Sequence, residues 1–375
     1  MMVAGSGAPG LAPDYAQGRA FPVVASLHHG KLRVVMGSER TVIGVDIGGT
    51  KIAAALLRER PPRAASGTPA ARETPEILDR STVLTDAGST QACLNGIMAC
   101  IADLEHGSGR GEGIGVGVAS MVDFAAGRVV ESVNLPLADV PLRDLLQRRF
   151  DVPVVIDNDA TAAAIGEHSF GAGAGAREML MLTLGTGVGG GIICGGRPYR
   201  GFSGAAAELG HIIIDVNGPK CPANCPNYGC LEAYVAGPAM AAAAAIAAEA
   251  APASALGRAL AAGHAIDGRL LTRLGQEGDA GAVDVLARLG EYLGAGLVTL
   301  VNIFNPEVIV IGGGAAAAGE LLLGPARGVL QARGSRPARD QVRVVPAMLG
   351  PDAGFIGAAA LALIELFPDD AHRSS

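Results

Sequence analysis

The stretch TVIGVDIGGTKIAAALL, residues 41–57, decides the fold class of this chain. Apolar and β-branched residues on both sides of Gly48 and Gly49 predict a strand, a glycine turn and a second strand. The stretch EMLMLTLGTGVGGGIICGG, residues 178–196, has the same form about 140 residues later. This repeat of form, without a repeat of sequence, predicts two similar α/β lobes with a central cleft between them.

Apolar strand patterns alternate with helical patterns through the rest of the chain. Helices are expected over about 88–105 and 141–150. Strands are expected over 113–123, 152–157 and 306–314, the last of which ends in glycines. Such alternation is typical of an α/β fold with a largely parallel sheet.

The lobes and the chain ends have expected boundaries. Residues 1–40 are predicted to be an irregular extension rich in Gly, Ala and Pro, and Met36 is a candidate for the true start. A small lobe is expected over 41–157, completed by a C-terminal helix near 354–367, and a large lobe over 158–353.

Composition and charge exclude several classes of protein. The chain has 375 residues, 49% of them apolar, which suits two domains with sizeable cores. The net charge of −7 argues against a nucleic-acid partner or an acidic membrane surface. The most apolar run, residues 239–252, contains Glu249 and predicts an Ala-rich helix and not a membrane span. With no signal-peptide pattern at the N-terminus, we expect a cytoplasmic protein.

The motif DIGGTK, Asp46 to Lys51, is a candidate phosphate loop. Glycines allow backbone N–H groups to approach an anion, and Thr50 adds a hydroxyl donor. A carboxylate beside a phosphate would repel it unless a divalent cation lay between them, so Asp46 predicts a nucleotide phosphate bridged by Mg²⁺. The alternative is a plain β-hairpin turn, and the spacing is not that of a P-loop.

Two further glycine clusters follow predicted strands. The motif LGTGVGGG, Leu184 to Gly191, holds more glycines than a plain hairpin needs, which predicts a second phosphate contact across the cleft. A flexible bend in a sheet is the alternative. The run IGGG, residues 311–314, is a weaker candidate for a backbone contact to the nucleoside.

The stretch VVIDNDATAAA, residues 154–164, places Asp157, Asn158 and Asp159 at the end of a predicted strand. Ligands of open α/β sheets bind at the carboxyl ends of strands. Asn158 offers a donor and an acceptor to a hydroxyl, and Asp159 is placed to take a proton from an attacking hydroxyl. The alternative is helix capping, which Asp and Asn also favour.

Three cysteines lie within ten residues, at Cys221, Cys225 and Cys230, with His211 ten residues upstream. Three thiolates and one imidazole suit a closed, tetrahedral Zn²⁺ site of structural type. The segment 211–232 is rich in Pro and Gly, so a metal ion is expected to order it in place of a helix or strand. A redox pair or free thiols are the alternative.

Two carboxylates accompany this cluster. Glu208 precedes His211 by three residues, and Glu232 follows Cys230 by two. If zinc orients one nitrogen of His211, the other nitrogen is free for a hydroxyl, and carboxylates with an imidazole suit a sugar. The alternative is that Glu208 and Glu232 are ordinary solvated charges.

Taken together, these motifs resemble the ROK sugar kinases of the hexokinase–actin–Hsp70 superfamily. The resemblance covers Thr41 to about Leu363, and the order and spacing of the motifs are more specific than any one of them. It implies two actin- or hexokinase-like (ribonuclease H-like) lobes, a dimer or tetramer, and ATP-dependent phosphorylation of a hexose. Glucose is the first candidate, and an N-acetylhexosamine, fructose or allose are alternatives.

The resemblance also implies roles for single residues. Asp159 matches the catalytic base, and His211, Cys221, Cys225 and Cys230 match the zinc ligands. The matching sugar contacts are Ser120, Asn134, Asn158, Asp159, Glu208, His211 and Glu232. The matching ATP contacts are Asp46, Gly48, Gly49, Thr50, Lys51, Gly185, Thr186, Gly187, Gly189, Gly313 and Gly314.

The sequence departs from the family pattern at three places. The step from Cys221 to Cys225 is longer than the family's usual first step. Ala119-Ser120 stands where Pro-Gly is common, and Ala207 stands where Gly often precedes Glu208. The family also contains sugar-responsive repressors, but residues 1–40 lack the amphipathic pattern that a helix-turn-helix needs.

Overall fold

The computed structural model describes residues 39–60, 73–222 and 224–368. The expected extension over 1–40, apart from its last two residues, and the candidate start at Met36 therefore lie outside the described residues.

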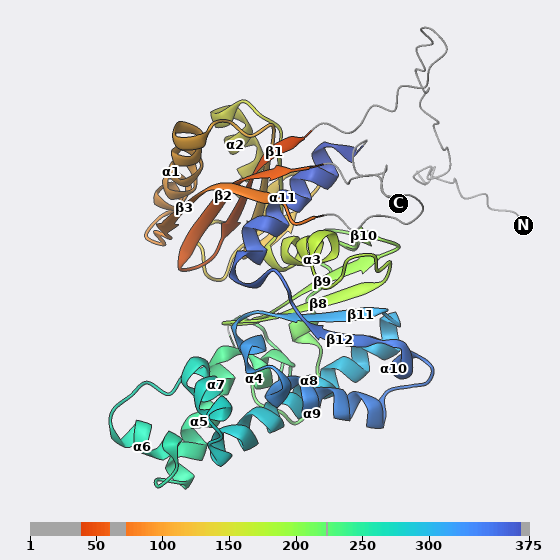
Figure 1. Cartoon of the computed structure of the whole chain (residues 1–375). Helices are drawn as coiled ribbons and strands as arrows, with labels where there is room; N and C mark the ends of the chain where they lie inside the picture. Colours follow the sequence, from red (N-terminus) through yellow and green to blue (C-terminus); the bar gives the residue numbers. More distant parts are fainter. Residues whose placement is uncertain (1–38, 61–72, 223, 369–375) are drawn as a thin grey trace, which may run out of the picture. The chain divides into compact units, whose positions relative to one another are not determined.

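The first sheet has five strands in the order β3-β2-β1-β4-β7 (Figure 1). Their bounds are β1 Arg40–Ile47, β2 Lys51–Glu59, β3 Glu76–Leu84, β4 Ile114–Val118 and β7 Val154–Asn158. A separate hairpin pairs β5, Met121–Asp123, with β6, Arg128–Glu131. The pairs β1–β2 and β2–β3 are antiparallel, whereas β1–β4 and β4–β7 are parallel.

The second sheet has the order β10-β9-β8-β11-β12. Its strands are β8 Met179–Leu184, β9 Val188–Cys194, β10 Arg197–Pro198, β11 Val308–Gly312 and β12 Arg343–Pro346. As in the first sheet, two neighbouring pairs, β10–β9 and β9–β8, are antiparallel, and two, β8–β11 and β11–β12, are parallel. The expected repeat of form is therefore present, but the expectation of largely parallel sheets is wrong for one half of each sheet. The glycine turns are too short for a crossover, so they force β1–β2 and β8–β9 to run antiparallel.

Helices cover the outer face of each sheet. On the first sheet these are α1, Thr90–Ser108, and α2, Leu142–Phe150. Between β10 and β11 of the second sheet the chain forms α4 Glu232–Val235, α5 Gly237–Ala250, α6 Ala255–Ala261, α7 Gly268–Gln276 and α8 Ala280–Phe304, and between β11 and β12 it forms α9 Glu320–Arg333 and α10 Ala338–Gln341. Short 3₁₀ turns lie at η1 Leu209–His211, η2 Gly314–Ala318 and η3 Gly350–Asp352.

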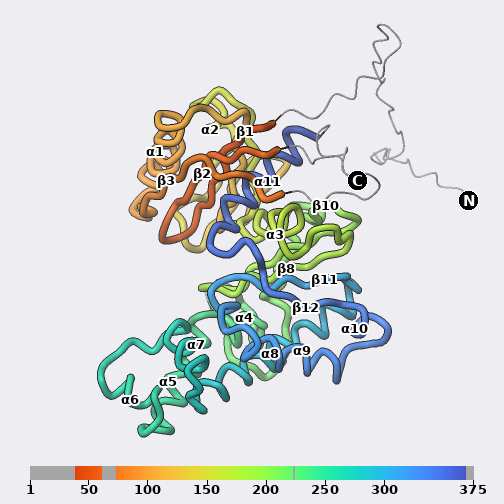
Figure 2. The backbone as a smooth tube through the Cα atoms, in the orientation of Figure 1, coloured from red at the N-terminus to blue at the C-terminus, as the bar shows by residue number. Residues whose placement is uncertain are grey.

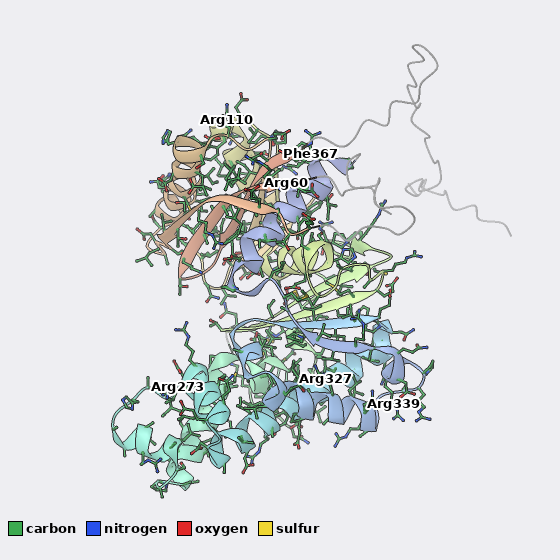
Figure 3. The ribbon with its side chains drawn as sticks, in the orientation of Figure 1. Arg60, Arg110, Arg273, Arg327, Arg339 and Phe367 are labelled. Carbon is green, nitrogen blue, oxygen red and sulfur yellow. The ribbon has the colours of Figure 1, made fainter. Side chains whose placement is uncertain are left out.

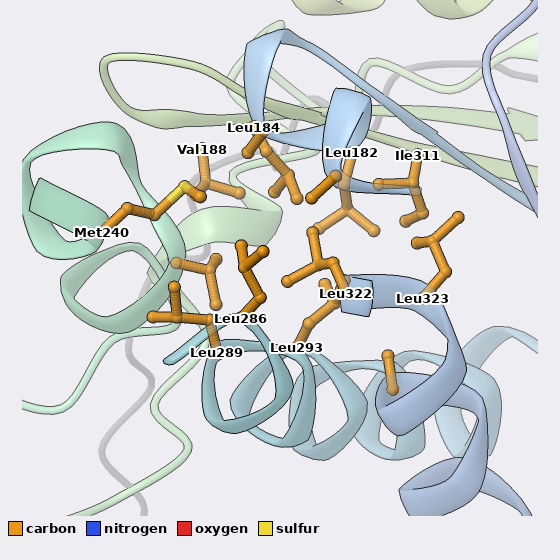
Figure 4. Packing of buried hydrophobic residues seen from close by; sticks show 14 of the residues in the cluster. Leu182, Leu184, Val188, Met240, Leu286, Leu289, Leu293, Ile311, Leu322 and Leu323 are labelled. Atoms are coloured by element: carbon orange, nitrogen blue, oxygen red, sulfur yellow. The ribbon is translucent and has the colours of Figure 1, made fainter. Parts of the chain in front are cut away.

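The core beneath the second sheet is aliphatic. Leu182 and Leu184 of β8 lie above leucines of α8 and α9, among them Leu293 and Leu322 (Figure 4). Arg327 of α9 donates from Nε and Nη2 to the carbonyl of Val344 in β12, at 3.0 and 2.8 Å (Figure 3). The second sheet is thus held to its helices by packing and by side-chain bonds to a strand.

Two helices lie against the inner faces of the sheets. The chain passes from β7 through α3, Asp159–Phe170, into β8, and returns from β12 to α11, Ala353–Leu366 (Figure 2). One buried cluster joins residues of both sheets with residues of α3 and α11. A Cβ atom on Gly166 of α3 would lie only 2.8 Å from Cα of Gly357 in α11, so glycine permits this close contact.

The helical elements have two consequences for the sequence expectations. The C-terminal helix α11 packs against β1, β4 and β7, while α3 contacts both β4 and β9. The division into lobes at 41–157 and 158–353 stays a prediction, because α3 belongs to the layer shared by the two sheets.

Within residues 39–60, 73–222 and 224–368, no single helix is long and apolar enough to cross a membrane. The pair α5 and α6, which is bent by 94°, is long and apolar enough only when the two helices are taken together, and this rests on length and composition alone.

Candidate active site

The first glycine turn joins β1 to β2. The N–H of Gly48 donates to the carbonyl of Lys51 at 3.0 Å, and Thr85 Oγ1 donates to the carbonyl of Gly48 at 2.7 Å. A Cβ on Gly49 would lie 3.1 Å from Cβ of Asn134, so the turn is in contact with the expected sugar-side loop. Thr50 and Lys51 are exposed. The turn is a fixed hairpin whose tip is open to a ligand, as a phosphate contact requires.

Asp46 lies near the end of β1, directly against the backbone of Gly354 at the start of α11. Burial, with a smaller contribution from the charge of Asp159, raises the pKa of Asp46 to about 6, and Lys51 opposes the shift. Two carboxylates, Asp46 and Asp159, are therefore close enough to interact. A cation between Asp46 and a phosphate would relieve that repulsion.

The residues at the end of β7 divide their tasks. Asn158 is the N-cap of α3, and its Oδ1 accepts from the N–H groups of Ala160 and Thr161, each at 3.0 Å. Its Nδ2 donates to Asp159 Oδ1 at 3.0 Å and to the carbonyl of Ser120 at 3.3 Å. Capping is thus one function of this stretch, and Asn158 fulfils it. Asp159 is left with a carboxylate that Asn158 holds in place.

The surroundings of Asp159 shift its pKa. Burial raises its pKa, and hydrogen bonds from Ala160 N–H and Asn158 partly oppose the shift. A carboxylate with a raised pKa is a stronger proton acceptor than a solvated one. The geometry therefore allows Asp159 to accept a proton from a hydroxyl at the end of β7.

Ser120 follows β4 and is buried, with an exposed fraction of 9%. Its N–H donates to the carbonyl of Val118 at 2.7 Å. Among the described residues, its Oγ has no hydrogen-bond partner. A buried hydroxyl without a partner is rare in proteins and is accounted for when a ligand bonds to it.

The second glycine turn joins β8 to β9 and is held by Glu232. The N–H of Gly185 donates to the carbonyl of Gly187 at 2.9 Å, and the N–H of Val188 donates to Glu232 Oε2 at 2.7 Å. A Cβ on Gly187 would lie 2.6 Å from Glu232 Oε2, so any side chain there would displace the carboxylate. Glu232 is buried and is not an ordinary solvated charge.

The other glycines of this motif have a packing role. A Cβ on Gly189 would lie 2.7 Å from Cβ of Ala160 in α3. Gly191 is likewise pressed against Ala164 of α3, and Gly190 against Leu209. Their number is therefore explained by the close approach of β9 to its neighbours, and it is not in itself evidence for a second phosphate contact. The contacts of Gly185, Thr186, Gly187 and Gly189 to a nucleotide stay predictions.

The third glycine cluster lies beside the second turn. Gly313 has φ +82° and its Cα faces the backbone of Leu184, the last residue of β8. Gly314 begins η2, with open space where a Cβ would be. The structure thus brings Gly313 next to Leu184, the residue that precedes the turn at 185–187, and the contacts of Gly313 and Gly314 to a nucleotide stay predictions.

His211, Cys221, Cys225 and Cys230 form the one group of potential metal ligands found among the described residues. Their ligand atoms all lie within 4.8 Å of one another. Cys225 Sγ lies 3.9 Å from Cys230 Sγ, and Cys221 Sγ lies 3.5 Å from His211 Nδ1. A tetrahedron with Zn–S bonds of about 2.3 Å has S···S edges of about 3.8 Å. The four residues, including Cys221 with its longer step, therefore fit a zinc ion.

The second nitrogen of His211 faces away from the cysteines. Its Nε2 lies 3.9 Å from Glu208 Oε2, and Glu208 is exposed. The side chain of Glu208 is 58% exposed, and the partial loss of its hydration raises its pKa; the charge of His211 lowers this pKa, while those of Glu232 and Asp159 raise it. The charge of Glu208 is therefore influenced by His211, Glu232 and Asp159. This is expected of polar side chains that line one site with several hydroxyl contacts.

A family model described as the ROK family matches residues 42–365. The chain belongs to the ROK family. The resemblance stated from the sequence is confirmed, and so is the fold class of two similar α/β lobes with a potential zinc segment.

Relatives of this ROK chain include both enzymes and regulators. It is 35% identical to a glucokinase of Halalkalibacterium halodurans over 85% of this chain and 94% of that protein. It is 31% identical to a xylose repressor of Bacillus spizizenii over 68% of this chain and 62% of the repressor. A crystal structure of a ROK family glucokinase from Streptomyces griseus in complex with glucose and AMPPNP is 37% identical, with a TM-score of 0.72 over 86% of this chain and 98% of that one.

Sequence reasoning about this ROK chain missed Arg200 and gave Asp157 no separate role. Arg200 Nε donates to Asp157 Oδ2 at 2.7 Å, and its Nη2 donates to Glu365 Oε1 at 2.8 Å. These partners are 43 and 165 residues away in sequence, so no local sequence motif indicates the contact. The only available signal was the surplus of polar residues at the end of β7, of which capping uses one.

Proposed function

We propose that this ROK chain is an ATP-dependent sugar kinase that phosphorylates a hexose, with glucose as the first expected substrate. The observation that supports it most is the placement of Asp159. Its half-buried carboxylate lies at the end of β7, fixed by Asn158, and it interacts with Asp46 beside the first glycine turn. A proton acceptor next to a phosphate loop is the arrangement that phosphoryl transfer to a hydroxyl requires.

In this proposal the sugar is held by side chains from both sheets. Asn134, Asn158 and Ser120 contribute from the first sheet and its loops. Glu208, His211 and Glu232 contribute from the segment after β10. Asp159 accepts the proton of the attacking hydroxyl as the oxygen bonds to the γ-phosphorus, and ADP leaves with the electrons of the broken P–O bond.

The glycine turns are proposed to hold the nucleotide. Gly48, Gly49, Thr50 and Lys51 face the phosphates from one side, and Gly185 to Gly187 from the other, with Gly313 and Gly314 beside the adenosine. Asp46 would hold Mg²⁺ at the phosphates, where the ion supplies charge neutralisation. ATP as the donor is also supported by the glucokinase structure that contains AMPPNP.

The cysteine cluster is proposed to hold a structural zinc ion. Burial raises the pKa of Cys221 and of Cys230, so thiolates at these positions need a cation beside them. With Nδ1 of His211 among the ligands, its Nε2 is presented toward Glu208 and the sugar. Zinc therefore acts on sugar binding through the orientation of one imidazole.

Two alternatives follow from the relatives and from the site. The pocket residues suit other hexoses, including N-acetylhexosamines, fructose and allose, because these sugars differ by one or two groups. A sugar-responsive regulator is favoured by the similarity to xylose repressors, such as that of Bacillus spizizenii. Asp159 favours the kinase, because a protein that only binds a sugar does not need a proton acceptor. Assembly into a dimer or tetramer stays a prediction.

The test is ADP release with ATP·Mg²⁺ over a panel of hexoses and N-acetylhexosamines, with mass spectrometry of the product. We expect one phosphorylated sugar to dominate. Binding of a sugar without any ADP release would overturn the kinase and favour the regulator.

A further inference from the structure

We propose that Arg200 is a positioning residue, which fixes the sugar-binding segment 199–211 against the strand end that carries Asp159. The inference rests on the proposed sugar kinase and concerns a residue to which the sequence motifs assign no role.

The guanidinium of Arg200 makes three separate contacts with distant parts of the chain. Its Nε donates to Asp157 Oδ2 at 2.7 Å and its Nη2 to Glu365 Oε1 at 2.8 Å. Its carbon Cζ lies 3.6 Å from the centre of the Phe124 ring. The side chain of Arg200 is 17% exposed and that of Asp157 is 6% exposed. A guanidinium that stacks on an aromatic ring and bonds to two carboxylates is held more firmly than one in a surface ion pair.

One path leads from Arg200 to the proposed base. Asp157 binds Arg200 through Oδ2, and its Oδ1 accepts from the N–H of Asn158 at 2.9 Å. Asn158 in turn holds Asp159 through Nδ2 at 3.0 Å. A change at Arg200 therefore reaches the carboxylate of Asp159 through two hydrogen-bonded residues.

A second path leads from Arg200 to the sugar ligands of the other sheet. The carbonyl of Arg200 accepts from the N–H of Ala206 at 3.1 Å, which closes the loop ahead of Glu208 and His211. Within that loop Gly204 has φ +87°, and a Cβ there would lie 2.7 Å from the carbonyl of Val122. The loop is thus held against the β5 hairpin, and Arg200 joins it to β7 and α11.

Stability alone is a poor explanation for this arrangement. A buried ion pair is often no more stabilising than an apolar pair of the same volume, because both charges lose their hydration. Arg200 instead connects the two groups of residues that must meet on one sugar. The relative position of these groups strongly affects the reaction rate, since a misplacement of a reacting group by about 1 Å lowers the rate by about 100-fold.

The test compares Arg200→Met with Arg200→Lys and Glu365→Gln. Arg200→Met removes both side-chain hydrogen bonds and leaves the backbone bond to Ala206, Arg200→Lys keeps the charge but not the planar fork, and Glu365→Gln, the matched control, disturbs only the contact to α11. For Arg200→Met we expect kcat to fall and the Kd for the sugar, from calorimetry, to rise, each by about 10-fold or more, with the KM for ATP changed less than about 3-fold. Arg200→Lys should restore part of the loss, and Glu365→Gln should stay near the wild type.

A second variant covers the case in which Arg200→Met does not fold. Arg200→Met leaves the carboxylate of Asp157 buried and unpaired, whereas Arg200→Met with Asp157→Asn removes both charges. A folded double variant with wild-type kcat and sugar Kd would overturn the proposal, as would Arg200→Met with wild-type values. An inactive wild type would defeat the proposed function and this inference together, while an active wild type with an unaltered Arg200→Met variant would defeat this inference alone.

Discussion

The carboxylate of Asp46 lies against the backbone of Gly354, so closely that no side chain larger than glycine fits at position 354 without displacing it. The contact joins the end of β1 to the first turn of α11. It removes water from Asp46, and with Asp159 nearby the pKa of Asp46 rises to about 6. An ionised carboxylate at this position lowers the free energy of unfolding, because it has lost hydration and lies near a second negative charge. Such a cost in stability is expected of a functional group, and it can be measured.

We predict that Asp46→Asn stabilises the protein in the absence of nucleotide and Mg²⁺ while abolishing turnover. The folded pKa of about 6 exceeds the ordinary aspartate pKa of 3.8, so the folded state binds more protons than the unfolded state between these pH values. Stability is therefore lost as the pH rises from about 4 through about 6, by on the order of 1–3 kcal/mol, and Asn escapes that loss. Urea denaturation at pH 4.5 and 7.5 should show that the variant is more stable than the wild type only at the higher pH.

Asp144→Asn, an exposed change in α2, is the control for Asp46→Asn and should move neither stability nor turnover. A variant Asp46→Asn that is less stable than the wild type at pH 7.5 would contradict the account of this carboxylate.

Ser120→Ala should change which sugars the protein distinguishes. If the buried Oγ bonds to one sugar hydroxyl, the wild type should reject the matching deoxy-sugar by about 10- to 100-fold in kcat/KM, and the variant should have lost that preference. The measurement is kcat/KM for the accepted hexose and its 2-, 3- and 4-deoxy analogues. Ser132→Ala is the control, because Ser132 Oγ already bonds to the carbonyl of Ala119 and the N–H of Leu135. Equal deoxy-sugar ratios in wild type and Ser120→Ala would remove Ser120 from the sugar site.

Local sequence signals predicted the elements well and their cross-chain contacts poorly. The hairpin at Gly48-Gly49 follows from two apolar runs around a turn, and the metal cluster follows from ligand spacing, so both could be predicted. The packing role of the glycines at 189–191 could not be predicted, because a sequence does not show that β9 approaches its neighbours so closely. Arg200 could not be found at all, since its partners come from β7 and α11.

Loss of the metal should weaken sugar binding through His211. Cys230→Ser, or a strong chelator, should reduce the zinc content from about one ion per chain to near zero and lower sugar affinity. Elemental analysis, calorimetry with the sugar and hydrogen exchange over 211–232 provide the readouts. Cys194→Ser is the control, because Cys194 is exposed and lies outside the ligand group. Carefully purified protein without zinc, yet with full sugar affinity, would show that no metal is needed here.

Ala207 is strained, and relieving the strain should raise stability. It has φ +71°, a conformation that costs a residue with a Cβ about 1–2 kcal/mol, and it directly precedes Glu208. Ala207→Gly should therefore stabilise the fold by about 0.5–1 kcal/mol after the entropy of glycine is counted. Thermal unfolding measures this, and Ala206→Gly, next to it without a positive φ, should destabilise instead. Equal effects of the two changes would argue against strain at position 207.

The most direct measurement is phosphoryl transfer by the wild type and by Asp159→Asn, assayed as ADP release with ATP·Mg²⁺ and the hexose that the panel identifies. We expect a wild-type product phosphorylated on a sugar hydroxyl. We also expect an Asp159→Asn variant that binds this sugar with similar affinity but turns over about 100- to 10,000-fold more slowly. An Asp159→Asn variant that retains full kcat, or a wild type that releases no ADP with any sugar, would contradict these expectations.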